Sequence, residues 1–438
     1  MKLSKGIPGW IDFSPAMQRL TRNAIAVLAV PGAIDELGLG VFRDSISNLL
    51  FPGTTVTMTR AVYLAFLPAC MYETETKLYK ERMKDGTSPT ADWYHAKMRQ
   101  LQNSFCKKNG ETTGIIGRDN YKRIRNDGDD ADAYIVRYPF FIYWNALCRW
   151  DLIPGGKDEN GNVMSMAAYI QRSCDLIHEG NNPETRWDDF VCKERKAAMN
   201  CCRFVGMEQE FIQKRMIDAL PDTLLGPMVK NGFDANCSLA KSLKDGSVIG
   251  IPLDKISEKI RMGVEDMGFF TVFMQTAFAA YNALLNWDAH KEEFRESLRV
   301  FREKYTRQDA EDRLNSMEER VGAKPGNDTA IFLEEWMKKC FQTPDNAVPD
   351  LNWIAQREVD KKPGGRAKIL KAWGGNPQNF EFINMIRWES QNSDFPALKP
   401  EKDWIGMDVL DYRWKETSRL VNDLLTNTYS GDASNDGK

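Results

Sequence analysis

Apolar residues recur at helical spacing through most of the chain, and the alternation that marks a β-strand is scarce. Val62 and Phe66, for example, lie four positions apart and fall on one face of a helix. The longest apolar stretch, residues 269–287, contains threonine, glutamine and asparagine and is flanked by aspartates, so it predicts a buried helix and not a membrane span. The pattern as a whole predicts a mostly α protein.

Clusters of glycine, proline, asparagine and aspartate interrupt this helical pattern. They lie at residues 85–92, 154–162, 178–185, 322–328 and 374–377. These breaks predict three helical regions and a disordered polar tail. The regions are residues 1–163, 164–321 and 322–425, and the tail is residues 426–438.

One segment in the N-terminal third predicts more than a helix. Residues 137–153 place Ile142, Leu147 and Trp150 on one buried helix face, and a glycine-rich polar turn follows at 154–162. A helix followed by a short β-hairpin is typical of a winged-helix domain, in which the helix enters the major groove and the hairpin touches the DNA backbone. The sequence therefore predicts a winged-helix-like segment here.

Composition limits what such a segment can bind. The 438 residues carry 59 Lys and Arg against 62 Asp and Glu, a net charge of −3, so any nucleic-acid contact depends on a local basic patch. Nine cysteines follow no disulfide pattern and favour a reducing cytoplasm. Three widely spaced histidines leave no basis for predicting a metal site, and no cofactor is expected.

Several groups of lysine and arginine are candidates for phosphate contact. They are Arg43 and Arg60 near the N-terminus, Arg118, Lys122, Arg123 and Arg125 after a Gly-Ile-Ile-Gly turn, Arg149 and Lys157 in the winged-helix-like segment, and Lys361, Lys362, Arg366 and Lys368 around a Pro-Gly-Gly turn. For the group after the Gly-Ile-Ile-Gly turn the alternative is a solvated surface, and for the group around the Pro-Gly-Gly turn it is a contact with a protein partner or a solvated surface. The aspartates that follow Arg125 favour that alternative there.

Arg60 raises a question of its own, because it follows a threonine-rich turn and heads an apolar helix. One interpretation is that Arg60 binds phosphate. The other, which we favour, is a structural ion pair with Asp44 that fixes how the first helices cross. Phosphate contact is the minority interpretation.

No catalytic signature is recognised. GxSxG, a P-loop and a Cys–His pair are all missing from the sequence. Asp360 and Lys362 have the acid-x-lysine spacing of metal-dependent nucleases, but further acids on a strand would be needed to hold Mg²⁺. The sequence therefore favours a non-enzymatic role.

Several stretches together resemble the uncharacterised bacterial family DUF6361, a domain of unknown function. They are residues 9–14, 33–40, 42–68, 114–118, 141–153, 355–375 and 410–414. The stretches 85–100 and 126–134 depart from that family's pattern by being longer and more polar. The resemblance implies a cytoplasmic prokaryotic protein from a defence-associated gene neighbourhood, beside helicase and phospholipase D-like nuclease genes.

Together these observations lead us to expect a non-enzymatic component of an antiviral defence system, which contacts DNA or a helicase or nuclease partner. Two alternatives stay open. One is a helical scaffold that binds no nucleic acid, and the other is a metal-dependent nuclease whose site is not recognised.

Overall fold

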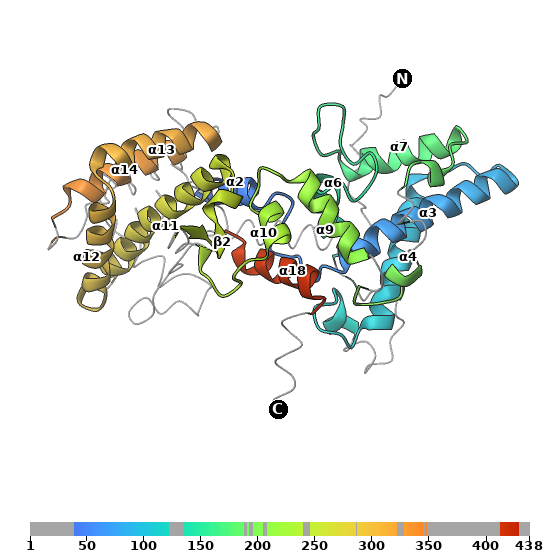
Figure 1. Cartoon of the computed structure of the whole chain (residues 1–438), viewed down its shortest axis with the longest axis horizontal. Helices are drawn as coiled ribbons and strands as arrows, with labels where there is room; N and C mark the ends of the chain where they lie inside the picture. Colours follow the sequence, from blue (N-terminus) through green and yellow to red (C-terminus); the bar gives the residue numbers. More distant parts are fainter. Residues whose placement is uncertain are drawn as a thin grey trace, which may run out of the picture. The chain divides into compact units, whose positions relative to one another are not determined.

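The computed structural model describes residues 39–121, 135, 137–187, 191, 196–204, 208–239, 246–285, 287–321, 328–344, 347 and 412–428. This part of the chain is mostly helical, which confirms the predicted fold class (Figure 1). The sheet described within it has two short antiparallel strands.

The helices and strands fall into three successive groups along the chain. The first half of the chain contributes α2 (Leu39–Leu50), α3 (Tyr63–Asp85), α4 (Ala91–Asn109), α6 (Pro139–Arg149), α7 (Met166–His178) and the 3₁₀ helix η1 (Pro183–Thr185). The middle contributes α9 (Glu208–Ala219), α10 (Leu225–Asn231), β1 (Ser247–Val248), β2 (Ile251–Pro252) and η3 (Leu253–Lys255). The remainder contributes α11 (Glu258–Leu285), α12 (Trp287–Lys304), α13 (Arg307–Val321), α14 (Asp328–Gln342) and α18 (Trp414–Thr426).

The chain divides into two compact units. The first contains Ser47–Met262 and the C-terminal helix α18, and the second contains Asp35–Ile46 and Gly263–Leu410. The junction at Met262–Gly263 lies inside α11, whereas the sequence breaks predicted region boundaries at 163 and 321. A helix can therefore run through a unit boundary that no Gly or Pro cluster marks.

The core of the first unit forms around α3. This helix is buried along its N-terminal half and packs against α4, α6 and α7. The rings of Phe66 and Phe105 stack with their centroids 4.0 Å apart, and Tyr63 joins them at 5.8 Å from Phe105. Far along the sequence, α18 returns to lie beside α9 and α10 (Figure 1).

The second unit is built on the predicted apolar helix, which is α11. Phe273 of α11 stacks on Phe301 of α12 at 5.6 Å, and the indole of Trp336 on α14 donates to Thr276 Oγ1 at 2.8 Å. The threonine in this apolar stretch is thus satisfied inside the unit. None of the helices in the described ranges is long and apolar enough to cross a membrane.

The segment predicted to be winged-helix-like consists of α6 and the loop that follows it, residues 151–165. An isolated antiparallel bridge between Lys157 and Val163 closes this loop, and no longer hairpin is assigned to it among the described residues. Asp158 Oδ1 stabilises the turn by accepting from the backbone N–H groups of Asn160 and Asn162 at 2.9 and 2.8 Å. The helix and the returning loop are observed, but a winged-helix domain is not established by them.

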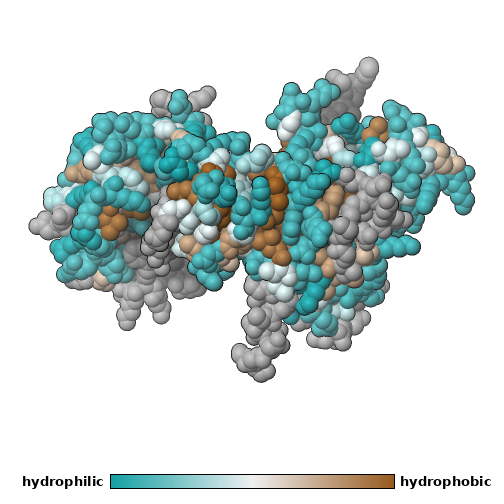
Figure 2. Space-filling model, viewed as in Figure 1, coloured by the Kyte–Doolittle hydropathy of each residue, from teal (hydrophilic) through white to brown (hydrophobic). Residues whose placement is uncertain are grey.

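Hydrophilic residues cover most of the described surface on the face that Figure 2 shows. Apolar side chains are mainly internal, and only a few large ones are strongly exposed, including Val56, Met83 and Phe141. The cysteines within the described ranges are all free.

Candidate functional site

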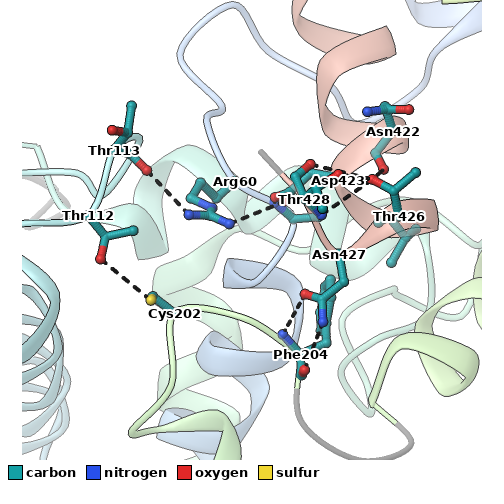
Figure 3. Close-up of polar contacts among 12 residues, drawn as sticks. Arg60, Thr112, Thr113, Cys202, Phe204, Asn422, Asp423, Thr426, Asn427 and Thr428 are labelled. Atoms are coloured by element: carbon teal, nitrogen blue, oxygen red, sulfur yellow. Dashed lines mark hydrogen bonds and ion pairs between the residues drawn. The ribbon is translucent and has the colours of Figure 1, made fainter. Parts of the chain in front are cut away.

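Arg60 lies in the interior of the first unit, with 1% of its side chain exposed. Its Nη2 is 3.4 Å from Asp423 Oδ1 on α18, and its Nη1 donates to the carbonyl oxygen of Thr113 at 3.4 Å. Figure 3 shows Arg60 between these two groups. In this position the guanidinium has almost no surface to offer an external phosphate.

Asp423 also accepts a hydrogen bond from the backbone, in addition to its ion pair with Arg60. Its Oδ2 accepts from the backbone N–H of Ala61 at 2.7 Å, just before α3 begins. The Tyr143 hydroxyl donates to the carbonyl oxygen of Arg60 at 2.9 Å and accepts from the N–H of Thr59. The threonine-rich turn is thus fixed by side chains from α6 and α18, which satisfy backbone groups that would otherwise be buried without partners.

Arg43 and Asp44, which the sequence interpretation grouped with Arg60, both lie in α2. Arg43 Nη2 is 3.1 Å from Asp44 Oδ1, and these side chains are 42% and 44% exposed. The ion pairs described for Arg60 and Asp44 therefore join them to Asp423 and Arg43. The proposed pairing between Arg60 and Asp44 is still only a prediction.

Glu75 of α3 is the centre of a second buried polar cluster. Its carboxylate is fully buried and accepts four hydrogen bonds, two on each oxygen. Oε1 accepts from the hydroxyls of Tyr94 at 3.3 Å and Tyr169 at 3.2 Å. Oε2 accepts from Arg186 Nη2 at 3.0 Å and from the indole of Trp187 at 2.6 Å. Four donors satisfy a carboxylate that burial would otherwise destabilise.

The two tyrosines of this cluster are held in their neutral form. Burial raises the pKa of Tyr169 well above its ordinary value and the charge of Glu75 raises it further, while Arg186 and Ser173 act in the opposite direction. Burial and then Glu75 also raise the pKa of Tyr94. A neutral phenol keeps the proton that it donates to Glu75, so the cluster is stable at neutral pH.

A cleft of about 240 Å³ opens beside the Glu75 cluster. The loop after α6 contributes one wall, α7 contributes another, and Arg186 follows η1. The lining residues are Pro154, Gly155, Tyr169, Arg172, Ser173, Leu176 and Arg186. Two arginines, a serine and a tyrosine thus line a single hollow at the base of the predicted wing.

Three polar groups at the cleft differ in how they are satisfied. Ser173 is fully buried, and although it acts on the pKa of Tyr169, its Oγ has no partner at hydrogen-bonding geometry. Arg186 Nε is also buried without a partner. Arg172 is exposed, and the contact described for its guanidinium is with the sulfur of Met164 at 3.9 Å. Within the described ranges, no carboxylate forms an ion pair with Arg172.

The remaining basic candidates are distributed unevenly. Arg149 is exposed at the C-terminal end of α6, and Lys157 lies 2.6 Å from Asp151 in the loop. Both residues lie near the Cys148 thiol. Burial is the main effect on the pKa of this thiol, which is raised to about 12, and the charges of Lys157 and Arg149 act in the opposite direction. The structure therefore brings Arg149 and Lys157 to the same end of α6.

Arg118 is half-buried, and its Nε has no partner. The other candidates lie outside the described residues. They are Lys122, Arg123, Arg125, Lys361, Lys362, Arg366 and Lys368, together with Asp360 of the nuclease hypothesis. Among the residues that are described, no group of three or more His, Cys, Asp and Glu side chains could hold a metal ion.

Sequence reasoning missed Glu75, Arg172, Ser173 and Arg186. The signal that was available is weak: Thr74, Glu75 and Thr76 are buried, but they belong to a five-residue polar run, 73–77, in a helix whose second half is also polar, so the sequence does not mark them as internal. No spacing rule connects that triplet with an arginine more than a hundred positions away. Only the packing of α7 and η1 on α3 brings them together.

Comparison with known proteins gives a match to a family model over part of the chain. No curated protein and no solved structure matches the chain. The family match ends at residue 136, so it includes Arg60 and Glu75 but not the cleft residues, which lie between Pro154 and Arg186. The resemblance expected from the sequence is confirmed over that segment: residues 6–136 match the model of a family of unknown function, DUF6361.

Proposed function

We propose that this chain is a non-enzymatic, mostly helical component of a prokaryotic antiviral defence system that contacts DNA. The observation that carries the DNA contact is the cleft, in which Arg172 and Arg186 lie against the loop that follows α6. The defence setting, the cytoplasmic location and a helicase or phospholipase D-like nuclease as partner come from the family resemblance, and they are part of the proposal.

Under this proposal α6 and its loop act as the winged-helix-like segment. In such domains the helix meets the bases and the wing meets the backbone. Here α6 buries most of its residues and leaves a narrow stripe of Phe141, Asn145 and Arg149 facing outward. A single arginine on that stripe offers little base recognition, so the contact is mainly with phosphates and depends weakly on sequence.

The charges near the loop set how strong this contact can be. Lys157 is already paired with Asp151, and Arg186 is paired with Glu75, so Arg149 and Arg172 supply most of the available positive charge. With a net charge of −3 on the whole chain, no general field adds to them. The expected binding is therefore moderate and strongly dependent on salt.

Fluorescence anisotropy of labelled duplex and single-stranded DNA, at rising salt concentration, tests the proposal on the full chain. Arg149→Ala and Arg172→Ala should each weaken binding and each reduce the slope of log affinity against log salt by about one. The control is Arg299→Ala, which removes another exposed arginine, one that is paired with Glu296 and Glu303 on α12. Binding that is absent, or that responds to the control as much as to the two variants, would contradict a DNA contact at this face.

A second candidate function is that of a scaffold that holds the helicase or nuclease and binds no nucleic acid. The observation that favours it is Phe141, which is 46% exposed on α6 although large aromatic side chains are usually internal. Co-purification with the neighbouring gene products should then be lost in Phe141→Ala and kept in Met83→Ala, a control that removes another exposed apolar side chain. Unchanged co-purification in both variants would count against Phe141 as the docking point.

A further inference from the structure

We propose that the cleft lined by Tyr169, Arg172, Ser173 and Arg186 is a binding site for a phosphate monoester, such as the 5′-phosphate end of a nucleic acid or the phosphate of a nucleotide. This inference rests on the proposed function and specifies which part of a nucleic acid the cleft receives. Its basis is the set of donors in the cleft, the depth at which they lie and the charge that they leave unbalanced.

The donors are prepared for a ligand that carries oxygen acceptors. Arg186 Nε is buried without a partner, and Ser173 Oγ is buried beside Tyr169 without a partner at hydrogen-bonding geometry; both residues line the cleft. Burying a polar group in this state costs about 1 to 3 kcal/mol, which folding tolerates poorly unless a ligand or water satisfies the group. Phosphate oxygens accept strongly from guanidinium and hydroxyl donors, so they would satisfy both groups at once.

Glu75 fixes the orientation of the Arg186 guanidinium group. Its Oε2 accepts from Arg186 Nη2 at 3.0 Å, which holds one edge of the guanidinium. A carboxylate that holds one edge of an arginine leaves the remaining N–H groups oriented before any ligand arrives, and this lowers the entropy lost on binding. Glu75 is therefore a positioning residue for Arg186.

The depth of the cleft favours the end of a chain over its middle. Ser173 Oγ lies just beneath the cleft surface, so a side chain at the rim must move before the tip of a ligand can reach it. A monoester presents three terminal oxygens to three donor side chains, Arg172, Ser173 and Arg186. An internal phosphodiester carries a nucleoside on each side and has only two terminal oxygens, one fewer than the donor side chains. Pro154 and Leu176 supply an apolar wall beside the sugar.

The charge balance favours one phosphate over several. Glu75 offsets the charge of Arg186, and Arg172 has no carboxylate partner within the described ranges. The cleft therefore contributes about one uncompensated positive charge. A phosphate monoester carries about −1.5 to −2 at neutral pH, so the cleft neutralises about half of its charge, and a diphosphate or triphosphate would leave still more charge unbalanced.

The test uses the full chain and a short oligothymidylate, labelled at its 3′ end, with either a 5′-phosphate or a 5′-hydroxyl. The phosphorylated form should bind about tenfold more tightly, the effect of one or two charge-assisted hydrogen bonds. Ser173→Ala and Arg172→Gln should remove this preference, and Arg299→Ala should keep it. Because Arg172 is exposed, its variant is expected to fold even if Ser173→Ala loses stability. AMP and inorganic phosphate serve as competitors.

The outcomes separate the two proposals. Equal affinity for both oligonucleotides, unchanged in Arg172→Gln, would overturn the monoester site and leave the DNA contact standing. Absence of oligonucleotide binding, together with an increase in melting temperature by AMP that requires Arg172 and Ser173, would support the site with a nucleotide as its ligand and overturn the DNA contact. No response to either oligonucleotide, to AMP or to phosphate would overturn both.

Discussion

The first unit contains two arginine–carboxylate clusters, and they differ in one respect. Arg60 and Asp423 are both sealed from solvent, with side-chain exposures of 1% and 3%. Glu75 is equally buried, but its partner Arg186 is 20% exposed and lines a cleft. The same pair of chemical groups thus fixes the architecture where both are enclosed, and leaves donors for a ligand where the arginine reaches the surface.

Removing the acid of the sealed pair should have the largest effect. Asp423→Ala leaves the Arg60 guanidinium buried beside one fewer acceptor and removes the acceptor of the Ala61 N–H, so the free energy of unfolding should fall by about 3 to 5 kcal/mol. Urea denaturation followed by circular dichroism measures this. Asp423→Asn, which keeps an acceptor for Ala61, should lose less, and equal losses would show that the charge of Asp423 matters more than its hydrogen bonds.

The open cluster should lose less than the sealed one. In Glu75→Gln one carboxylate oxygen becomes an NH₂ group, which the hydroxyls of Tyr94 and Tyr169 can accommodate by rotating to accept. Arg186 keeps an oxygen and can hydrate its charge through the cleft, so we expect a loss of about 1 to 3 kcal/mol in the free energy of unfolding. If Glu75→Gln lowered the free energy of unfolding more than Asp423→Ala does, the idea that the open cluster matters less for stability than the sealed one would be wrong.

The tyrosines of the open cluster predict a dependence on alkaline pH. Because the pKa of Tyr169 is raised in the folded state, its contribution is complete below the unfolded value of about 10 and is lost as the pH rises toward the folded value. The slope for one tyrosine is about 1.4 kcal/mol per pH unit. Urea midpoints measured above about pH 10 should fall less steeply for Tyr169→Phe than for the original chain, and parallel curves would contradict the shift.

The exposed pair of α2 should have the smallest effect. Arg43 and Asp44 are both more than two-fifths exposed, so their ion pair gains little in water and is screened by salt. Asp44→Ala should change the free energy of unfolding by less than about 1 kcal/mol, in the same urea experiment. A loss comparable with that of Asp423→Ala would mean that Asp44 has a partner of greater importance than Arg43.

The helical fold was predictable because it depends on local periodicity, and α11 follows from its apolar stretch in the same way. The partner of Arg60 was not predictable. The sequence interpretation paired Arg60 with Asp44 in the preceding helix, whereas the acid described beside Arg60 is Asp423, which lies 363 positions away. Ion pairs between distant elements depend on how helices pack, and neither composition nor spacing encodes that. The cleft was missed for the same reason, since the loop, α7 and η1 each contribute only part of it.

Asp423 and Asn427 have a consequence for how the chain is made. Asp423 supports the start of α3, and the Asn427 side chain exchanges hydrogen bonds with both backbone groups of Phe204 at 2.9 Å. These contacts span more than two hundred positions and form only after residue 427 has left the ribosome. Until then the Ala61 N–H lacks its side-chain acceptor, so the first unit completes its folding only after residues 423 and 427 have been made.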